Sequence, residues 1–145
     1  MITISHLTKI FEGKGPRVTA LEDVNLEIGK GDIYGIIGMS GAGKSTLLRC
    51  LTLLERPTSG QIMLAGQDIA SLSGAQLRAA RRGMGVVFQG YNLLMQKTVA
   101  ENVAFPLRLE KGYDKAAVQA RVAELLAIVG LEDRAGAYPA PLSGG

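Results

Sequence analysis

One stretch of eight residues has the composition and spacing of a phosphate-binding loop. Residues 38 to 45 read Gly-Met-Ser-Gly-Ala-Gly-Lys-Ser, which satisfies the pattern G-x-x-x-x-G-K-[ST]. Phosphate oxygens need several backbone N–H groups that point inward, and glycines let the chain curl tightly enough to supply them. A lysine at the end of such a loop can reach the β- and γ-phosphates, and the hydroxyl that follows can hold Mg²⁺. The stretch therefore predicts a nucleoside triphosphate site in which Lys44 binds phosphate and Ser45 binds the metal.

The predicted nucleotide-binding residues are the loop and the residue after it. They are Gly38, Met39, Ser40, Gly41, Ala42, Gly43, Lys44, Ser45 and Thr46. The alternative is a glycine-rich turn with a chance Lys-Ser, but the flanking segments favour a phosphate site because they predict a strand before the loop and a helix after it. By itself the motif does not identify the class of NTPase.

Three other places in the chain are candidates for the same chemistry, and each has a plainer alternative. Gln89 ends a predicted strand, where it would reach Mg²⁺ or an attacking water, or it is an ordinary loop glutamine. The stretch 142–145, Leu-Ser-Gly-Gly, would form a second anion-binding helix start, or a flexible tail. Phe11 follows the first predicted strand and offers a ring that can stack on a base, or it belongs to the core.

The first ninety residues alternate between strand patterns and helix patterns, as an α/β fold does. Apolar residues predict strands near 1–7, 23–28 and 61–66, and two continuous apolar runs, 33–37 and 84–89, predict buried parallel strands. Helices are predicted at 44–55 and 72–83. The first of these has an apolar stripe of Leu47, Leu48, Leu51 and Leu54.

After Gly90 the patterns become helical. Thr98 and Glu101 fit a capping box, and Pro106 should kink or end the helix that they begin. A second helix is predicted at 114–129, with Gly130 as its left-handed stop. Its apolar stripe is Val118, Val122, Leu125, Leu126 and Val129. The chain therefore predicts an α/β core piece, residues 1–90, and a helical subdomain, residues 91–145.

The composition excludes several classes of protein. Hydrophobic residues make up 47% of the chain and charged residues 20%, which favours a folded domain over a disordered one. No apolar run reaches the ~18 residues that span a bilayer, and no signal peptide is predicted. The single Cys50 cannot form an internal disulfide, so we expect a reducing cytosol. Arg78, Arg81 and Arg82 lack interleaved aromatic residues, so we expect a solvated helix face and not a nucleic-acid site.

Taken together, these motifs resemble those of the ATP-binding-cassette (ABC) ATPases. "GMSGAGKS" resembles their Walker A motif, Gln89 their Q-loop glutamine, "LSGG" the start of their signature motif, and Phe11 the aromatic residue that stacks on adenine. Within the family, "DIYGIIGMSGAGKSTLLRCLTLLERPTSG" and "TVAENVAFPLRL" resemble the ATPases of methionine-uptake importers most. The ATPases of cell-division and lipoprotein-export complexes are close relatives. One departure is "FQGYNLL", where a His-aromatic pair is expected after the glutamine.

The resemblance implies a P-loop NTPase fold, an α/β core with a parallel sheet plus a helical subdomain, which binds ATP and Mg²⁺. Lys44 and Gln89 would be catalytic, and Ser45 and Gln89 would hold Mg²⁺. Two copies would dimerise head to tail, so that Ser143, Gly144 and Gly145 of one face the ATP of the other. The segment after Gln89 would dock on a membrane permease at the cytoplasmic face of the cell membrane, and a separate binding protein would deliver methionine.

The resemblance also implies that this sequence is C-terminally truncated, because it stops within the signature motif. The Walker B strand, the catalytic Glu and the switch His have no counterpart, and the only histidine, His6, lies in the first predicted strand. We therefore expect an ATPase in the full-length protein, an inactive 145-residue chain alone, and an incomplete core with exposed apolar edges. The alternatives are a non-catalytic nucleotide-binding product, and an ATPase for cell division or lipoprotein export.

Overall fold

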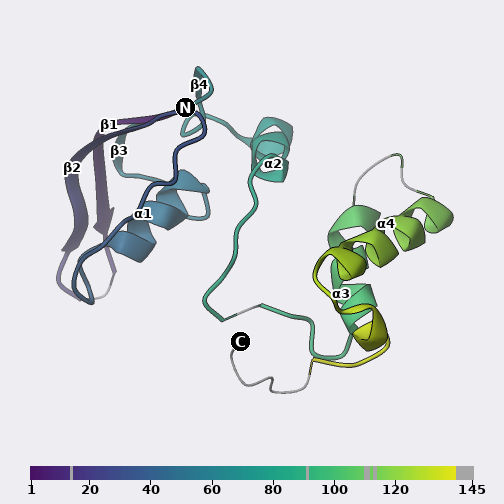
Figure 1. Cartoon of the computed structure of the whole chain (residues 1–145). Coiled ribbons are helices and arrows are strands. Elements are labelled where there is room, and N and C mark those ends of the chain that lie inside the picture. Colours follow the sequence, from purple (N-terminus) through teal and green to yellow (C-terminus); the bar gives the residue numbers. More distant parts are fainter. Residues whose placement is uncertain (14, 91, 110–111, 113, 140–145) are drawn as a thin grey trace. The chain divides into compact units, whose positions relative to one another are not determined.

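The computed structural model describes residues 1–13, 15–90, 92–109, 112 and 114–139. It divides into two compact units, Met1–Val86 and Val87–Gly145 (Figure 1). The sequence predicted a division at residue 90, four residues later than the structure places it. Each unit has a hydrophobic cluster of its own.

The first unit is built on a four-stranded antiparallel sheet in the order β2-β1-β3-β4. The strands are β1 (Ile2–Phe11), β2 (Val18–Ile28), β3 (Ser59–Leu64) and β4 (Gln67–Asp68). The alternation predicted at 23–28 is confirmed, because Val24, Leu26 and Ile28 are partly buried while Asn25 and Glu27 are exposed. One face of the sheet therefore turns to the core.

An irregularity at His6 keeps the apolar side chains of β1 on the core-facing side of the sheet. The pairing with β2 shifts between Ile4 and Leu7, and His6 has a positive φ of 52°. An extra residue of this kind offsets the two-residue alternation, so Ile4 and Leu7 are both buried although they are three positions apart. Beyond the irregularity, Lys9 and Phe11 follow Leu7 at two-residue spacing and so lie on the same side of the strand, with Lys9 partly buried and Phe11 exposed.

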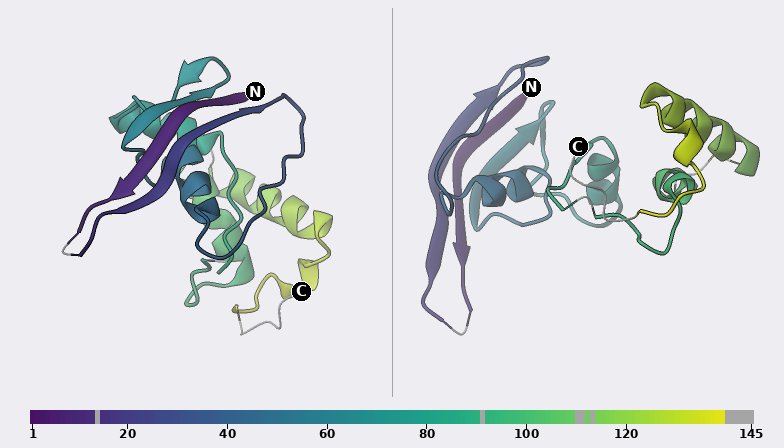
Figure 2. Two further views of the ribbon diagram at one scale, coloured as in Figure 1. Left: turned by 90° about the vertical axis from the view of Figure 1, so that its left-hand side faces the viewer. Right: turned by 60° about the horizontal axis from the view of Figure 1, so that its bottom comes forward.

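Helix α1 (Lys44–Leu51) covers one face of this sheet (Figure 2). Leu47 and Cys50 are the buried residues of the helix. The predicted stripe is therefore wrong in part, since Leu48 is 53% exposed and Leu54 49% exposed. The helix ends at Leu51, so Leu54 does not lie on it, and the face that meets the sheet is the one that carries Cys50.

Helix α2 (Gly74–Arg82) follows β4 and agrees with the helix predicted at 72–83. Its three arginines do not all face solvent freely, because the Arg81 guanidinium donates to the carbonyl of Leu53. Arg56, in the loop between α1 and β3, similarly donates to the carbonyl of Leu72 at 2.8 Å. These contacts tie the segment after α1 to the segment around α2.

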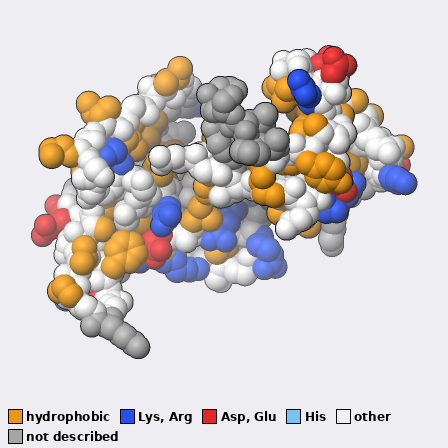
Figure 3. All heavy atoms as spheres, turned by 90° about the horizontal axis from the view of Figure 1, so that it is seen from below, with side chains coloured by type: hydrophobic (Ala, Val, Ile, Leu, Met, Phe, Trp, Pro, Cys, Tyr) orange, Lys and Arg blue, Asp and Glu red, His pale blue; other side chains and the backbone are white. Residues whose placement is uncertain are grey.

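The two segments predicted as buried parallel strands are not strands. Residues 33–37 and 84–88 have no regular structure, and Ile33, Ile37 and Val87 are 103%, 95% and 99% exposed. A parallel strand needs strands beside it and helices over both faces, and none of the four strands in the described ranges pairs with either segment. The sheet that forms is therefore antiparallel, and apolar side chains stand on the surface, as the orange spheres of Figure 3 show for one side.

The second unit is a pair of helices, α3 (Val99–Arg108) and α4 (Lys115–Ile128), followed by the short 3-10 helix η1 (Glu132–Arg134). Its hydrophobic cluster is formed by the buried residues Ala104, Val118, Val122 and Leu126. The predicted stripe is wrong at Val129, which is 61% exposed because the helix has already ended there. Helix α3 runs two residues past Pro106 before it ends.

Both predicted end signals of these helices are present. Thr98 Oγ1 accepts from the Glu101 N–H at 3.2 Å, and a Glu101 carboxylate oxygen accepts from the Thr98 N–H at 2.9 Å. At the end of α4, Gly130 has a φ of 66°, and the Leu131 N–H donates back to the Leu126 carbonyl at 2.9 Å. This is the geometry of a left-handed helix stop.

Candidate nucleotide-binding site

The loop at residues 38–43 leads directly into α1, as the phosphate-loop motif requires. Gly38, Gly41 and Gly43 have φ values of 154°, 82° and 86°, a region that side chains with a Cβ rarely adopt. Gly43 is also closely packed, because a Cβ there would lie 2.5 Å from the Ala20 carbonyl oxygen of β2. The glycines therefore permit the curl of the loop and its close approach to the sheet.

The start of α1 presents free backbone donors to this loop. The first bond inside the helix runs from the Leu47 N–H to the Gly43 carbonyl at 2.8 Å. The N–H groups of Lys44, Ser45 and Thr46 precede that bond, and neither a capping side chain nor an acidic residue stands in the first turn. Such a helix start carries a partial positive charge and binds anions.

The Lys44 side chain folds back over the loop. Its Nζ donates to the Gly38 carbonyl at 2.8 Å and to the Met39 carbonyl at 2.6 Å. The ammonium group is thus held at the mouth of the loop, with the backbone donors of α1 on the same segment. An anion in the loop would meet both the lysine charge and these donors.

The loop also has a group suited to Mg²⁺. Ser45 is exposed in the first turn of α1. Mg²⁺ usually takes one or two protein oxygens and completes its shell with phosphate oxygens and water, so a single hydroxyl beside a phosphate site fits this ion. Within the described ranges no group of three His, Cys, Asp or Glu side chains could hold a metal by themselves.

Phe11 lies at the end of β1 and is 39% exposed. The loop contacts β2 at Ala20, and the next residue of β2, Leu21, pairs with Lys9 of β1. Phe11 is two residues further along β1, so the ring and the loop belong to the same part of the first unit. Phe11 and the loop both belong to the first unit, and the stacking role of Phe11 stays a prediction.

Gln89 is the one other predicted site residue that lies within the described ranges. Gln89 is exposed and belongs to the second unit, whereas the loop belongs to the first. Ser143, Gly144 and Gly145 lie outside the described residues. His6 is on the sheet, where its Nδ1 is 2.7 Å from a carboxylate oxygen of Asp23.

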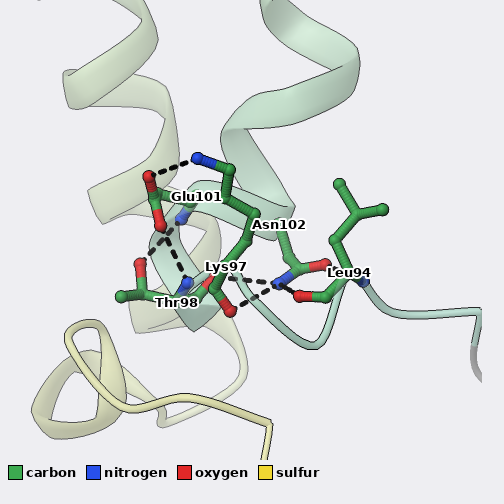
Figure 4. A network of polar contacts seen from close by, with 5 residues as sticks. All are labelled: Leu94, Lys97, Thr98, Glu101 and Asn102. Carbon is green, nitrogen blue, oxygen red and sulfur yellow. Dashed lines mark hydrogen bonds and ion pairs between the residues drawn. The ribbon is translucent and has the colours of Figure 1, made fainter.

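Two sets of contacts, around Phe11 and before α3, were not predicted from the sequence. The first is the contact between Lys9 and the Phe11 ring. Its only signal in the sequence was a charged residue two positions before an aromatic one on a strand. Asn102 holds the loop before α3 with four hydrogen bonds, from the Leu94 N–H and to the carbonyls of Leu94, Lys97 and Thr98, at 2.8 to 3.1 Å (Figure 4). An asparagine one turn after a helix cap was the only signal.

Glu101, in the same network, has a lowered pKa. The hydrogen bond from the Thr98 backbone N–H is the main cause, and the hydrogen bond with Lys97 adds to it. Both stabilise the charged carboxylate. No helix among the described residues is long and apolar enough to cross a membrane.

Comparison with known proteins places this geometry in a family. A family model described as "ABC transporter" matches residues 21–145. The methionine import ATP-binding protein MetN of Desulfitobacterium hafniense is 53% identical over all 145 residues, and that of Symbiobacterium thermophilum is 54% identical. The chain spans 42% and 43% of the length of these two relatives.

Solved structures agree with this assignment. The dimeric post-hydrolysis structure of the ATP-binding cassette MJ0796, bound to ADP and Pi, superimposes with a TM-score of 0.88 at 33% identity, and the match covers 99% of this chain and 63% of that one. A second dimeric structure of MJ0796 gives a TM-score of 0.87. From its motif, its loop geometry and these likenesses, the chain belongs to the ABC transporter family and has the fold of an ABC ATPase cassette.

Proposed function

We propose that the protein carrying this chain is the ATP-binding subunit of an importer, and that it hydrolyses ATP to drive methionine uptake. The observation that carries the proposal is the loop at 38–46, which combines a helix start, glycines with positive φ and the Lys44 ammonium in one place. Methionine is supported by the names of relatives that share more than half of these residues. The alternatives in cell division and lipoprotein export have no observation in their favour.

In this proposal each loop residue has a defined task. Lys44 exchanges its contacts with the Gly38 and Met39 carbonyls for contacts with the β- and γ-phosphates. The N–H groups at the start of α1 bind the phosphate oxygens, and the Ser45 hydroxyl binds Mg²⁺, which neutralises phosphate charge. Gln89 contacts Mg²⁺ or the attacking water, and Phe11 stacks on the adenine.

A nucleotide-binding measurement tests the loop. Replacing Lys44 with Ala removes charge-assisted hydrogen bonds worth about 1.5–3 kcal/mol, so ATP affinity should fall about 10- to 150-fold. Lys30→Ala is the matched control, because Lys30 is exposed in the turn before the loop segment. Equal ATP affinity in both variants would contradict the proposed phosphate site.

Hydrolysis of ATP needs a group that binding does not. Activating the attacking water needs a general base, and residues 38–46, which form the described loop and helix start, include no carboxylate. We therefore propose that the 145 residues bind ATP without turning it over, while the whole protein turns it over. Steady, Lys44-dependent phosphate release by the 145-residue polypeptide would refute this.

We also propose that the second unit docks on a membrane permease, with the protein peripheral on the cytoplasmic face and two copies in each transporter. The loop before α3 exposes Leu93, Leu94 and Met95 at 44%, 39% and 53%, and Asn102 fixes its backbone. A fixed apolar loop suits docking on another protein. Co-purification of a methionine-type permease, lost on Leu94→Asp and kept on Leu109→Asp, would support this. Leu109 is the matched control because it is 69% exposed on the same unit. Co-purification of a cell-division permease instead would overturn the substrate assignment.

A further inference from the structure

Lys9 is an almost buried lysine whose contacts the proposed function does not use. Its side chain is only 12% exposed. The Nζ atom donates to a Glu55 carboxylate oxygen at 2.6 Å and to the Arg56 carbonyl at 2.8 Å. Removing an ammonium group from water is costly unless partners of this kind replace the lost water, so these two groups fix the position of the Lys9 side chain.

The same ammonium lies 4.8 Å from the centroid of the Phe11 ring. A cation at this distance is attracted to the face of an aromatic ring. Lys9 and Phe11 are two residues apart on β1, which places both side chains on one side of the strand. Lys9 therefore covers part of the ring and restrains its orientation, while 39% of Phe11 stays accessible to a ligand.

Glu55 connects this arrangement to the phosphate loop. Its backbone N–H donates to the carbonyl of Arg49 at 3.0 Å, and Arg49 lies in α1, which begins at the loop. The Lys9–Glu55 ion pair also borders the core at Cys50. Burial raises the pKa of the Cys50 thiol, the charge of Lys9 lowers it, and the charge of Glu55 raises it. The ring, the ion pair and α1 thus form one continuous set of contacts.

We infer that Lys9 is a positioning residue for nucleotide binding. Held by Glu55 and Arg56, it sets the Phe11 ring at the angle at which the ring stacks on the base, and it fixes that ring relative to the helix that carries the phosphate site. This inference rests on the proposed function, because it takes Phe11 as the base-stacking residue. The competing role for Lys9 is purely structural, as one half of an ion pair that supports the fold.

Comparing two ligands separates these roles. ATP uses both the ring and the loop, whereas inorganic tripolyphosphate has no base and uses the loop alone. In the natural protein that carries this sequence, Lys9→Met should lower ATP affinity about three- to tenfold and leave tripolyphosphate affinity within about twofold. Phe11→Leu should have the same selective effect, and Lys9→Arg, which keeps the charge over the ring, should restore most of the ATP affinity.

A double variant tests whether Lys9 acts through Phe11. If it does, Lys9→Met combined with Phe11→Leu should bind ATP no more weakly than Phe11→Leu alone. Additive losses, or equal losses for ATP and tripolyphosphate, would overturn the inference. If Lys9→Met does not fold, Glu55→Gln weakens the anchor of Lys9 and should show the same selectivity.

The failure of this inference is distinguishable from the failure of the proposed function. If Phe11→Leu leaves ATP affinity unchanged while Lys44→Ala lowers it, the phosphate site stands and the positioning role of Lys9 is wrong. If Lys44→Ala changes neither ligand, the phosphate site itself is wrong.

Discussion

Replacing Gly43 with Ala gives the sharpest test of the loop geometry. Gly43 has a φ of 86°, which costs a residue with a Cβ about 1–2 kcal/mol. The new Cβ would also lie 2.5 Å from the Ala20 carbonyl oxygen and 3.0 Å from Leu21 Cδ2. Overpacking of this kind adds about 1–3 kcal/mol, so we expect a total loss of about 2–5 kcal/mol in the free energy of unfolding.

Gly41→Ala is the matched control in the same loop. Gly41 has a similar φ of 82°, but a Cβ there would meet no atom within 4 Å. Only the backbone strain then remains, and we expect a loss of about 1–2 kcal/mol. The difference between the two variants isolates the close approach of the loop to β2.

Urea unfolding followed by circular dichroism measures these losses without nucleotide, and ATP binding is measured in parallel. If the loop yields locally, the cost of Gly43→Ala will appear as weakened ATP binding rather than lowered stability. A Gly43→Ala variant that matches Gly41→Ala in both measurements would refute the packing of Gly43 against Ala20.

Three further predictions follow from single contacts. Gly60→Ala should unfold the first unit, because Gly60 has a φ of 94° and the new Cβ would lie 2.6 Å from Leu7 Cα. Gly66→Ala is the control, since a Cβ there has space and the variant should lose only the free energy of its backbone strain. Thermal unfolding compares the two variants. Asn102→Ala removes four hydrogen bonds and leaves the Lys97 carbonyl and the Leu94 N–H without the Asn102 partner, so it should cost about 1–3 kcal/mol, with faster hydrogen exchange at residues 94–98. Unchanged exchange would refute the clamp. Glu101 has a lowered pKa in the folded state, so its contribution to stability is complete above its ordinary pKa of 4.5 and is lost as pH falls through the lowered value. Glu101→Gln, which can still cap the helix, should remove that part of the dependence of stability on acid pH. An identical profile of stability against pH in both proteins would contradict this.

Local signals in the sequence predicted the ends of several elements correctly. The capping box of Thr98 and Glu101 and the left-handed stop at Gly130 depend on residues within one helical turn of each other. The phosphate loop is equally local, because its glycines, its lysine and the start of α1 are consecutive. Such features need no knowledge of distant partners.

Burial was predicted less well because it depends on partners elsewhere in the chain. The apolar runs at 33–37 and 84–88 have the composition of buried strands, yet Ile33 and Val87 are fully exposed because no strand in the described part of the chain pairs with them. The stripe on α1 was misplaced for a similar reason, since the sheet meets the face that carries Cys50 and not the one that carries Leu48.

The amino-acid sequence alone determined the glycine loop at 38–43 and the helix that follows it, because these features use consecutive residues and their own backbone groups. The tertiary structure decided which side chains from separate elements meet. It joined Lys9 of β1 to Glu55 after α1, placed that ammonium over Phe11, and set Gly43 against Ala20. Those contacts join residues up to 46 positions apart. They depend on the pairing of strands, which the sequence of a single segment does not determine.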